Sequence, residues 1–459
     1  MATLAIVGAG FCGTMVATHV LRAQRSGIRR VVLVERAGRE IGGVAYGTAS
    51  TSHTLNVPVG RMSAFEDDPD DYLRHVRNRD PALTGGAFVP RRLYGEYLLR
   101  TLGEAARSSE CELHRVAGEA VDAREHEDGV RLTLLDGRIV DADQAVLAVG
   151  NYPPSDPPAV AERLATSLRY ARDPWTPDAL ERARDEPVLL LGSGLTMCDI
   201  VLALRDDDQR APIVAISRRG LLPQAHRLST KPPPHLEPPG DLEDWPATVL
   251  GLLRGLRREV HAAAERGVDW REVVTSIRQQ TPDIWQRLDA EERRRFLRHA
   301  RPYWETHRHR SSPETAFAVE SMRESGAVEL LPARVARVVE TPTGVTVTYV
   351  PRDGAAPREL VVGKVINCTG PDTDLARVRD PLIRALREHG TIRPDPLGLG
   401  LDTDEDGRLI GAAGTPSGRL TLVGPLRKGR LWEHTAVPEL RVEAKRVAER
   451  LCAEVQVSD

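Results

Sequence analysis

Short apolar runs that end in glycine recur along the chain, and two of them are followed by residues with helical periodicity. Residues 3–7 form such a run before Gly8, and the segment after it places apolar side chains on one helical face. Residues 188–191 form another before Gly192, and an apolar helix again follows, continuing through Leu204. Apolar runs bounded by glycine predict buried strands, and apolar positions three and four residues apart predict helices. The pattern therefore predicts two strand–turn–helix units of an α/β protein with parallel sheets.

The turn of the first unit reads Gly8-Ala9-Gly10-Phe11-Cys12-Gly13, and the next predicted strand ends in Glu35. A G-x-G-x-x-G turn between strand and helix, with an acidic residue about 20 positions further on, is typical of a dinucleotide site. Gly8 permits the tight turn, Gly10 lets the backbone approach a pyrophosphate, and Gly13 lets the helix pack close to the strand. Glu35 is expected to accept hydrogen bonds from a ribose. The alternative is a glycine-rich turn that binds no ligand.

The second unit repeats this arrangement with two changes. Its turn reads Gly192-Ser193-Gly194-Leu195-Thr196-Met197, so a methionine stands where the first unit has its third glycine. Its second strand ends in Ser217-Arg218-Arg219 instead of an acid. Arginines suit a 2′-phosphate, whereas an acid suits a free ribose, so NADPH is favoured over NADH. A structural turn, and arginines that are only solvated, are the alternatives.

The α/β pattern is interrupted over residues 221–325. A proline-rich segment that includes Pro232 to Pro234 predicts an irregular loop, and amphipathic helices follow, which we interpret as a helical insertion in the second domain. The insertion ends in the basic segment Trp304 to Arg310, for which an anion-binding role and a solvated basic surface are both open. His307 and His309 are a poor metal pair because residues two apart on a helix point to different sides.

Two further apolar runs, residues 145–149 and 365–369, end in Gly150 and Gly370 and are expected to mark the crossings between the two nucleotide domains. The tail, a strand, loop and helix over residues 420–451, is expected to return to the first domain. We therefore predict a first domain over 1–152, a second over 153–370 with its insertion at about 221–325, and completion of the first domain by 371–459.

Composition narrows the classes of function. The net charge of −3 argues against a general nucleic-acid binder, and no apolar stretch is long enough to span a membrane. No secretory signal is apparent, and the five scattered cysteines are typical of a reduced, cytoplasmic protein and give no metal site or dithiol motif. Aromatic residues make up only 4 % of the chain, so no aromatic substrate cage is indicated and a small polar substrate is favoured. The oligomeric state stays open, with a homodimer among the options.

These motifs resemble those of the FAD/NAD(P)-binding proteins of the two-dinucleotide flavoprotein superfamily. The resemblance implies two Rossmann-like domains in a glutathione-reductase-like arrangement, with FAD at the first site and NADPH at the second. It also implies that the residues after Gly424 point toward the flavin. The segments that carry it are Gly8 to Gly13, Gly43 to Pro58, Gly192 to Asp199, Ser217 to Gly220, Trp304 to Arg310, Gly424-Pro425 and Trp432 to Glu439. The residues expected to contact the cofactors are Gly8, Gly10, Phe11, Cys12, Gly13, Glu35, Tyr46, Asn56, Gly150, Gly192, Gly194, Leu195, Thr196, Arg218, Arg219, Gly370, Gly424 and Trp432.

Within that superfamily the chain is similar to N-hydroxylating flavin monooxygenases of natural-product pathways, including those that oxidise aspartate to nitrosuccinate. This similarity implies oxygen transfer to a small polar amine or amino acid through a flavin hydroperoxide, with O₂ as co-substrate and no protein nucleophile. The residues expected to contact the substrate are His53, His307, Arg308 and Arg310. Two alternatives stay open: an NADPH-dependent oxidoreductase without oxygen insertion, and a non-catalytic flavin-binding redox sensor.

Overall fold

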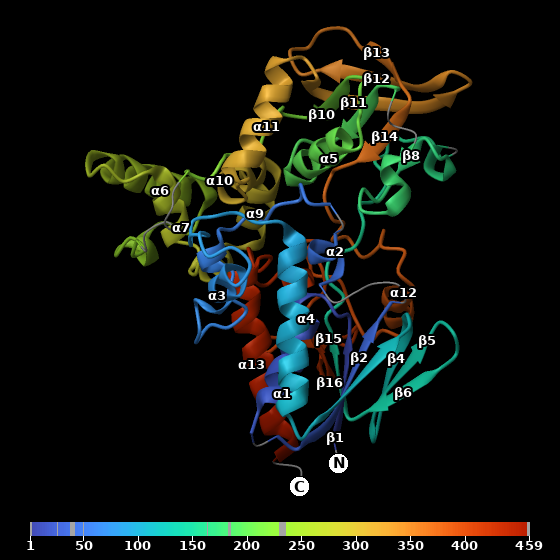
Figure 1. Cartoon of the computed structure of the whole chain (residues 1–459), viewed down its shortest axis with the longest axis vertical. Helices are drawn as coiled ribbons and strands as arrows, with labels where there is room; N and C mark the ends of the chain where they lie inside the picture. Colours follow the sequence, from blue (N-terminus) through green and yellow to red (C-terminus); the bar gives the residue numbers. More distant parts are fainter. Residues whose placement is uncertain are drawn as a thin grey trace.

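The structure is a computed structural model, and it describes residues 2–24, 26–36, 42–48, 50–162, 164–181, 185–228 and 236–456. The predicted loop prolines at 232–234 lie outside these residues. Two domains, each built on a mainly parallel sheet, follow one another along the long axis of the molecule, and a helical lobe projects from one side between them (Figure 1). Both chain termini lie at the far end of the first domain (Figure 1).

The first sheet has the strand order β15-β16-β7-β1-β2-β3, in which all neighbours except β15 and β16 are parallel. Helices α1, α4 and α13 bury their apolar faces on one side of this sheet. The three-stranded antiparallel sheet β4-β5-β6, together with α12, covers the other side. The elements are β1 (Ala2–Val7), α1 (Phe11–Arg22), β2 (Ile28–Glu35), α2 (Gly43–Tyr46), α3 (Asp71–Arg77), α4 (Arg91–Ser108), β3 (Glu112–Ala117), β4 (Ala120–His126), β5 (Gly129–Leu134), β6 (Ile139–Ala142), β7 (Gln144–Leu147), α12 (Pro381–Glu388), β15 (Arg408–Ile410), β16 (Pro416–Leu422) and α13 (Val437–Gln456).

The second sheet has the order β13-β12-β11-β10-β9-β14-β8, with parallel pairing from β11 to β8 and antiparallel pairing at the other edge. Helices α5 and α11 pack against its parallel part. The elements are β8 (Tyr170–Ala171), β9 (Val188–Leu191), α5 (Leu195–Asp206), β10 (Ile213–Ser217), α11 (Pro313–Glu324), β11 (Val328–Thr341), β12 (Gly344–Pro351), β13 (Arg358–Val362) and β14 (Lys364–Asn367).

The predicted helical insertion is confirmed, because five helices and a π-helical turn, followed by α11, connect β10 to its parallel neighbour β11. Asp289 caps α9 by accepting a hydrogen bond from the Glu292 amide at 2.8 Å. In a capping box the Glu292 side chain would bond back to the Asp289 amide; here it accepts from the Val249 amide at the start of α6 instead, at 2.7 Å. The helices are α6 (Val249–Glu265), α7 (Trp270–Ser276), α8 (Thr281–Arg287), α9 (Ala290–Arg295), the π-helical turn Phe296–Ala300 and α10 (Arg301–Arg308).

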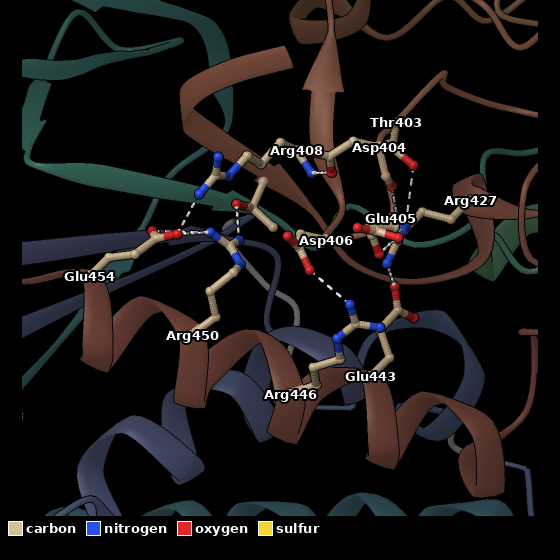
Figure 2. Close-up of polar contacts among 11 residues, drawn as sticks. Thr403, Asp404, Glu405, Asp406, Arg408, Arg427, Glu443, Arg446, Arg450 and Glu454 are labelled. Atoms are coloured by element: carbon tan, nitrogen blue, oxygen red, sulfur yellow. Dashed lines mark hydrogen bonds and ion pairs between the residues drawn. The ribbon is translucent and has the colours of Figure 1, made fainter.

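The C-terminal strands β15 and β16 belong to the first sheet, and α13 packs with α1 on one side of it. A polar network links these C-terminal elements to one another (Figure 2). At its centre the buried guanidinium of Arg427 donates to Glu443 of α13 at 2.7 Å. Its other nitrogens reach Thr403 Oγ1 at 3.3 Å and the carbonyl of Asp404 at 3.1 Å. A buried charge is stable only when it is paired and its hydrogen bonds are satisfied. The strands of the first sheet come from residues before 152 and after 370, and those of the second sheet come from the residues between. We therefore retain the predicted domain limits at 152 and 370 as a proposal.

Candidate functional site

The glycine loop after β1 has the shape that its sequence predicts. Gly8 has φ +103°, and a Cβ there would overlap the Ala148 carbonyl oxygen of the neighbouring β7 segment. A Cβ at Gly13 would overlap the Gly8 carbonyl oxygen. At Gly10, in contrast, a Cβ would meet no atom of the described residues within 4 Å. Gly8 and Gly13 are therefore required by the protein itself, whereas Gly10 borders open space beside the N-terminus of α1.

The glycine loop after β9 repeats this geometry. Gly192 has φ +111°, and a Cβ there would overlap the Cys368 carbonyl oxygen of the neighbouring β14 segment. Gly194 again borders open space, with no atom within 4 Å of a Cβ. Gly150 and Gly370, which follow β7 and β14, occupy corresponding places and both have positive φ. The two units thus present the same backbone cradle, each built from a glycine loop and the neighbouring strand end.

The strands that follow the two loops end in residues of different charge. The Glu35 carboxylate lies against the first loop, where it accepts a hydrogen bond from the Ala9 amide at 2.6 Å. In the second unit the same place holds hydroxyls, with Ser193 Oγ 2.7 Å from Ser217 Oγ. Arg218 is exposed, and the Arg219 guanidinium lies 5.9 Å from the Tyr303 ring centre. The first loop is therefore bordered by a carboxylate, whereas the second is bordered by hydroxyls and its strand is followed by two arginines.

A segment of the first domain crosses its own glycine loop. The Gly42 amide donates to the Ala9 carbonyl at 2.9 Å, and Gly43 packs on Gly10. Tyr46 of α2 lies with its ring 4.6 Å from that of Tyr94, which Phe11 also contacts from within α1. Gly424 approaches the same region from the C-terminal part of the chain, because a Cβ there would lie 3.2 Å from Cys12 Sγ. Among the predicted cofactor residues, Gly10, Phe11, Cys12, Tyr46 and Gly424 are thus brought together.

A buried ion pair that the sequence analysis missed joins the two domains. Arg91, at the start of α4, contacts Asp199 of α5 at 2.8 Å and donates to the Thr54 carbonyl at 2.9 Å. His53 lies beside this pair, with Nδ1 2.7 Å from Thr48 Oγ1 and its ring 5.6 Å from that of Trp175. Burial raises the pKa of Asp199, although Arg91 and His53 favour the charged carboxylate. His53, a predicted substrate residue, is thus placed at the contact between the domains.

Asn56 is likewise placed at an internal contact, since its carbonyl lies 3.0 Å from Nε2 of His226. Burial and the neighbouring Arg310 lower the pKa of His226 from 6.5 to about 3. As the pH falls from 6.5 toward 3, the unfolded chain therefore binds a proton at this histidine that the folded chain does not bind. The contribution of His226 to the free energy of unfolding is complete above pH 6.5 and is lost as the pH falls below it.

We expect the free energy of unfolding to fall as the pH is lowered from 6.5 toward 3, by at most about 1.4 kcal/mol per pH unit from this histidine. Urea unfolding of the wild type and of His226→Gln at several pH values measures this contribution. Glutamine keeps a donor for the Asn56 carbonyl but does not titrate, so the variant should show a shallower slope. Equal slopes would contradict the assignment.

The side chains of the basic segment at the end of the insertion point in different directions. Arg308 and Arg310 are buried, and we call them, with Arg278, the arginine cluster. Arg308 reaches Glu433 at 3.4 Å and Glu439 at 3.7 Å, whereas Arg278 holds Glu439 through both carboxylate oxygens. His307 is on the outer side, where its ring lies 5.1 Å from Trp270. The structure thus brings Arg308 and Arg310 together and leaves His307 apart from them.

The arginine cluster has more positive charge than its carboxylates neutralise at close range. Arg310 donates to Thr275 Oγ1 at 2.9 Å, and burial together with Arg308 lowers its pKa to about 10. Burial would raise the pKa of Glu433, but His309 and Arg308 hold it well below its usual range. An anion with access to this cluster would be stabilised, because it would relieve repulsion between buried guanidinium groups.

Trp432, a predicted cofactor residue, lies under the helical insertion and not beside a glycine loop. Its ring stacks on that of Trp285 at 4.7 Å, and it packs with Leu288 and Leu399. Its neighbour Glu433 is buried, with φ +76°, and accepts a hydrogen bond from the Trp304 indole at 2.7 Å. Glu433, and not Trp432, therefore contacts the arginine cluster. The only feature of the sequence that indicated Glu433 was its place in the segment Trp432 to Glu439, which carries part of the resemblance.

The two loops fit dinucleotides in shape and in hydrogen-bonding capacity. Neither α1 nor α5 has a side-chain cap at its N-terminus, so the first amide groups of both helices are available to a diphosphate.

Among the described residues, no group of three or more His, Cys, Asp or Glu side chains could hold a metal ion. No helix in the described part of the chain is long and apolar enough to cross a membrane. All five cysteines are buried and free.

Comparisons with known proteins agree with this geometry. Residues 5–152 match the sequence profile of a family described as FAD-NAD(P)-binding, and no curated protein matches the chain. Among solved structures, the chain is similar to an ornithine N-hydroxylase of Kutzneria sp. 744 with reduced FAD, NADP⁺ and L-ornithine (15 % identity, 99 % of both chains covered, TM-score 0.66). It is also similar to L-lysine 6-monooxygenase of Pseudomonas syringae (17 %, 98 % of this chain and 99 % of that one, 0.64) and to thioredoxin reductase of Lactococcus lactis (11 %, 100 % of both, 0.54). These likenesses confirm the predicted fold of two Rossmann-like domains.

Proposed function

We propose that this chain, which opens with an FAD-NAD(P)-binding domain, is an FAD-dependent, NADPH-consuming monooxygenase that N-hydroxylates a small polar amine or amino acid, with aspartate as the first candidate. One observation carries the proposal. Two glycine loops of the same geometry, at Gly8–Gly13 and Gly192–Met197, each leave open space beside an uncapped helix N-terminus. A chain with two such cradles suits the pairing of a flavin with a nicotinamide dinucleotide.

The first loop suits FAD, because the Glu35 carboxylate beside it can accept hydrogen bonds from ribose hydroxyls and the segment 42–46 covers the loop. The second loop suits NADPH, because Arg218 and Arg219 follow β10 where a carboxylate would repel a 2′-phosphate. Bound FAD would supply the redox chemistry, taking electrons from NADPH and delivering them to O₂. The chain's own residues hold the cofactors, exclude water and orient the substrate.

The arginine cluster is the proposed substrate site. Guanidinium groups match the planar geometry of carboxylates, so Arg308 and Arg310 suit a substrate that carries one or two of them. Glu433 would keep Arg308 oriented, since it contacts both Arg308 and His309 and is itself held by the Trp304 indole. The two hydroxylases to which the chain is similar are named for ornithine and lysine, which are amino acids with a second amine. The buried positive charge here favours an acidic amino acid instead.

The experiment that tests the proposal measures NADPH and O₂ consumption by the FAD-loaded protein with L-aspartate, L-ornithine, L-lysine and no amine, with products identified by mass. We expect consumption that depends on aspartate and yields a hydroxylamine or a more oxidised nitrogen. Turnover only under anaerobic conditions with an added quinone would identify an oxidoreductase without oxygen insertion. A flavin that neither nicotinamide reduces would identify a binding protein or sensor.

A double substitution tests the cofactor preference. Arg218→Ala with Arg219→Ala should weaken NADPH binding about tenfold or more and leave NADH binding nearly unchanged, because each lost charged hydrogen bond costs about 1.5–3 kcal/mol. The dependence of the flavin reduction rate on the concentration of each nicotinamide measures both affinities. Arg29→Ala with Arg30→Ala, an exposed pair on β2 of the other sheet, is the matched control. A preference that does not change would remove these arginines from the site.

A further inference from the structure

The helical insertion contains a cavity that the proposed reaction does not use. It has a volume of about 880 Å³, and its walls come from α6, α7, α8 and the segment from Arg295 to His307, with Trp432 from the C-terminal part of the chain. Cavities of roughly 300–1,000 Å³ hold small organic ligands. The glycine loops and Arg308 and Arg310 are not part of its lining, so it is a separate site.

The lining gathers most of the tryptophans of the protein. Five of the six tryptophans line the cavity, together with Phe296 and Tyr303: they are Trp245, Trp270, Trp285, Trp304 and Trp432. The low aromatic content of the sequence did not indicate that aromatic side chains gather at one place; the small polar substrate that it favoured stays a prediction. The few tryptophans are far apart in sequence but converge on one cavity, because helices α6 to α10 fold back over Trp432.

The charged and imidazole groups of the lining are all basic. They are Arg257, His261, Arg295, His299 and His307, and the described residues of the lining include no aspartate or glutamate. Arg295 is neutralised by Glu291 and Glu292. Arg257, His261 and His299 are exposed and make no hydrogen bond or ion pair within the described part of the chain. An apolar interior with unpaired donors at its rim is complementary to an amphipathic anion.

The extent of exposed apolar surface argues against a second copy of the chain as the occupant. Among the described lining residues, Leu250, Leu253 and Tyr303 are the large apolar side chains that are strongly exposed, at 55 %, 39 % and 46 %. A stable interface between protein chains takes about 20–30 residues from each partner. The apolar surface here is instead concave and turned inward, which suits a small molecule.

We propose that this cavity binds an amphipathic organic anion, with its hydrocarbon body among the tryptophan rings and its carboxylate, sulfonate or phosphate group at Arg257 and His299. The cavity adjoins the arginine cluster through a shared wall, since Trp304 lines the cavity and donates to Glu433, which contacts Arg308. The ligand therefore occupies a site next to the proposed substrate site but distinct from both dinucleotide sites.

Two dyes with the same ring system test this proposal on the FAD-loaded protein by calorimetry. 1-Anilinonaphthalene-8-sulfonate carries an anionic group, whereas N-phenyl-1-naphthylamine is its neutral analogue. We expect both to bind at one site per chain. Arg257→Glu should weaken the sulfonate about tenfold or more and change the neutral dye little. Leu256→Trp, which fills the cavity, should weaken both dyes.

Arg254→Glu is the matched control, because Arg254 is also an exposed, unpaired arginine of α6 but does not line the cavity. It should leave the binding of both dyes nearly unchanged. If Leu256→Trp disturbs folding, Leu253→Glu at the exposed rim replaces it and should weaken both dyes. Absence of dye binding, or equal losses for Arg254→Glu and Arg257→Glu, would overturn the proposal. So would sedimentation that shows a dimer dissociated by Leu256→Trp, since the occupant would then be a second copy.

Discussion

Gly10→Val is expected to give a folded protein that is purified without FAD. Gly10 has φ −69° and ψ −171°, which valine adopts readily, and a Cβ there meets no protein atom within 4 Å. The branched side chain would instead fill the space that a pyrophosphate needs beside the N-terminus of α1. Flavin absorbance relative to protein absorbance should fall from about one FAD per chain to near zero, while circular dichroism and the unfolding transition show that the fold remains.

Two controls make this result specific. Gly418→Val introduces the same side chain into open space at an exposed position of β16 and should keep its FAD. Gly13→Ala should destabilise the protein itself, because its Cβ would overlap the Gly8 carbonyl oxygen. A yellow, flavin-loaded Gly10→Val protein would contradict the assignment of FAD to the first loop.

Gly194→Val is expected to have the opposite effect, retaining FAD but losing reduction by NADPH. Gly194 also has an extended backbone, with φ −87° and ψ −165°, and open space around its Cβ position. Blocking the diphosphate removes several charge-assisted hydrogen bonds worth about 1.5–3 kcal/mol each, so NADPH affinity should fall about 100-fold or more. Anaerobic flavin reduction, followed as a function of NADPH concentration, measures this loss.

Dithionite provides the control for the second experiment, because it reduces bound flavin without using the nicotinamide site. The Gly194→Val flavin should therefore still be bleached by dithionite at the wild-type rate. Loss of colour in Gly194→Val, together with retention in Gly10→Val, would reverse the cofactor assignment. Unchanged NADPH kinetics would show that the second loop is only a structural turn.

The parts of the fold that the sequence predicted correctly depend on contacts between near neighbours in the chain. The strand, turn and helix around Gly8 and around Gly192 are contiguous, and their glycines are needed for local steric reasons. The insertion was recognisable because amphipathic periodicity replaced the α/β pattern over a long segment. Even there, the Glu292 side chain caps the distant α6 instead of closing its own capping box.

The candidate site depends more on contacts between distant residues. Arg91 and Asp199 lie on helices of different domains, and Arg308 meets Glu433 from the far end of the chain. Nothing in either local sequence specifies such a partner, so Arg91 and Glu433 were not singled out individually. His53 was expected to contact the substrate and Trp432 a cofactor; in the structure His53 contacts Thr48 and Trp175, and Trp432 stacks on Trp285.

By itself, the sequence determined that this protein has two dinucleotide cradles, because a glycine loop between strand and helix is a local backbone requirement that residue order expresses directly. Tertiary structure alone decided which charges are buried together and where five tryptophans meet. Burial and charge pairing arise when segments separated by more than a hundred residues pack against one another, and that packing is a property of the whole chain.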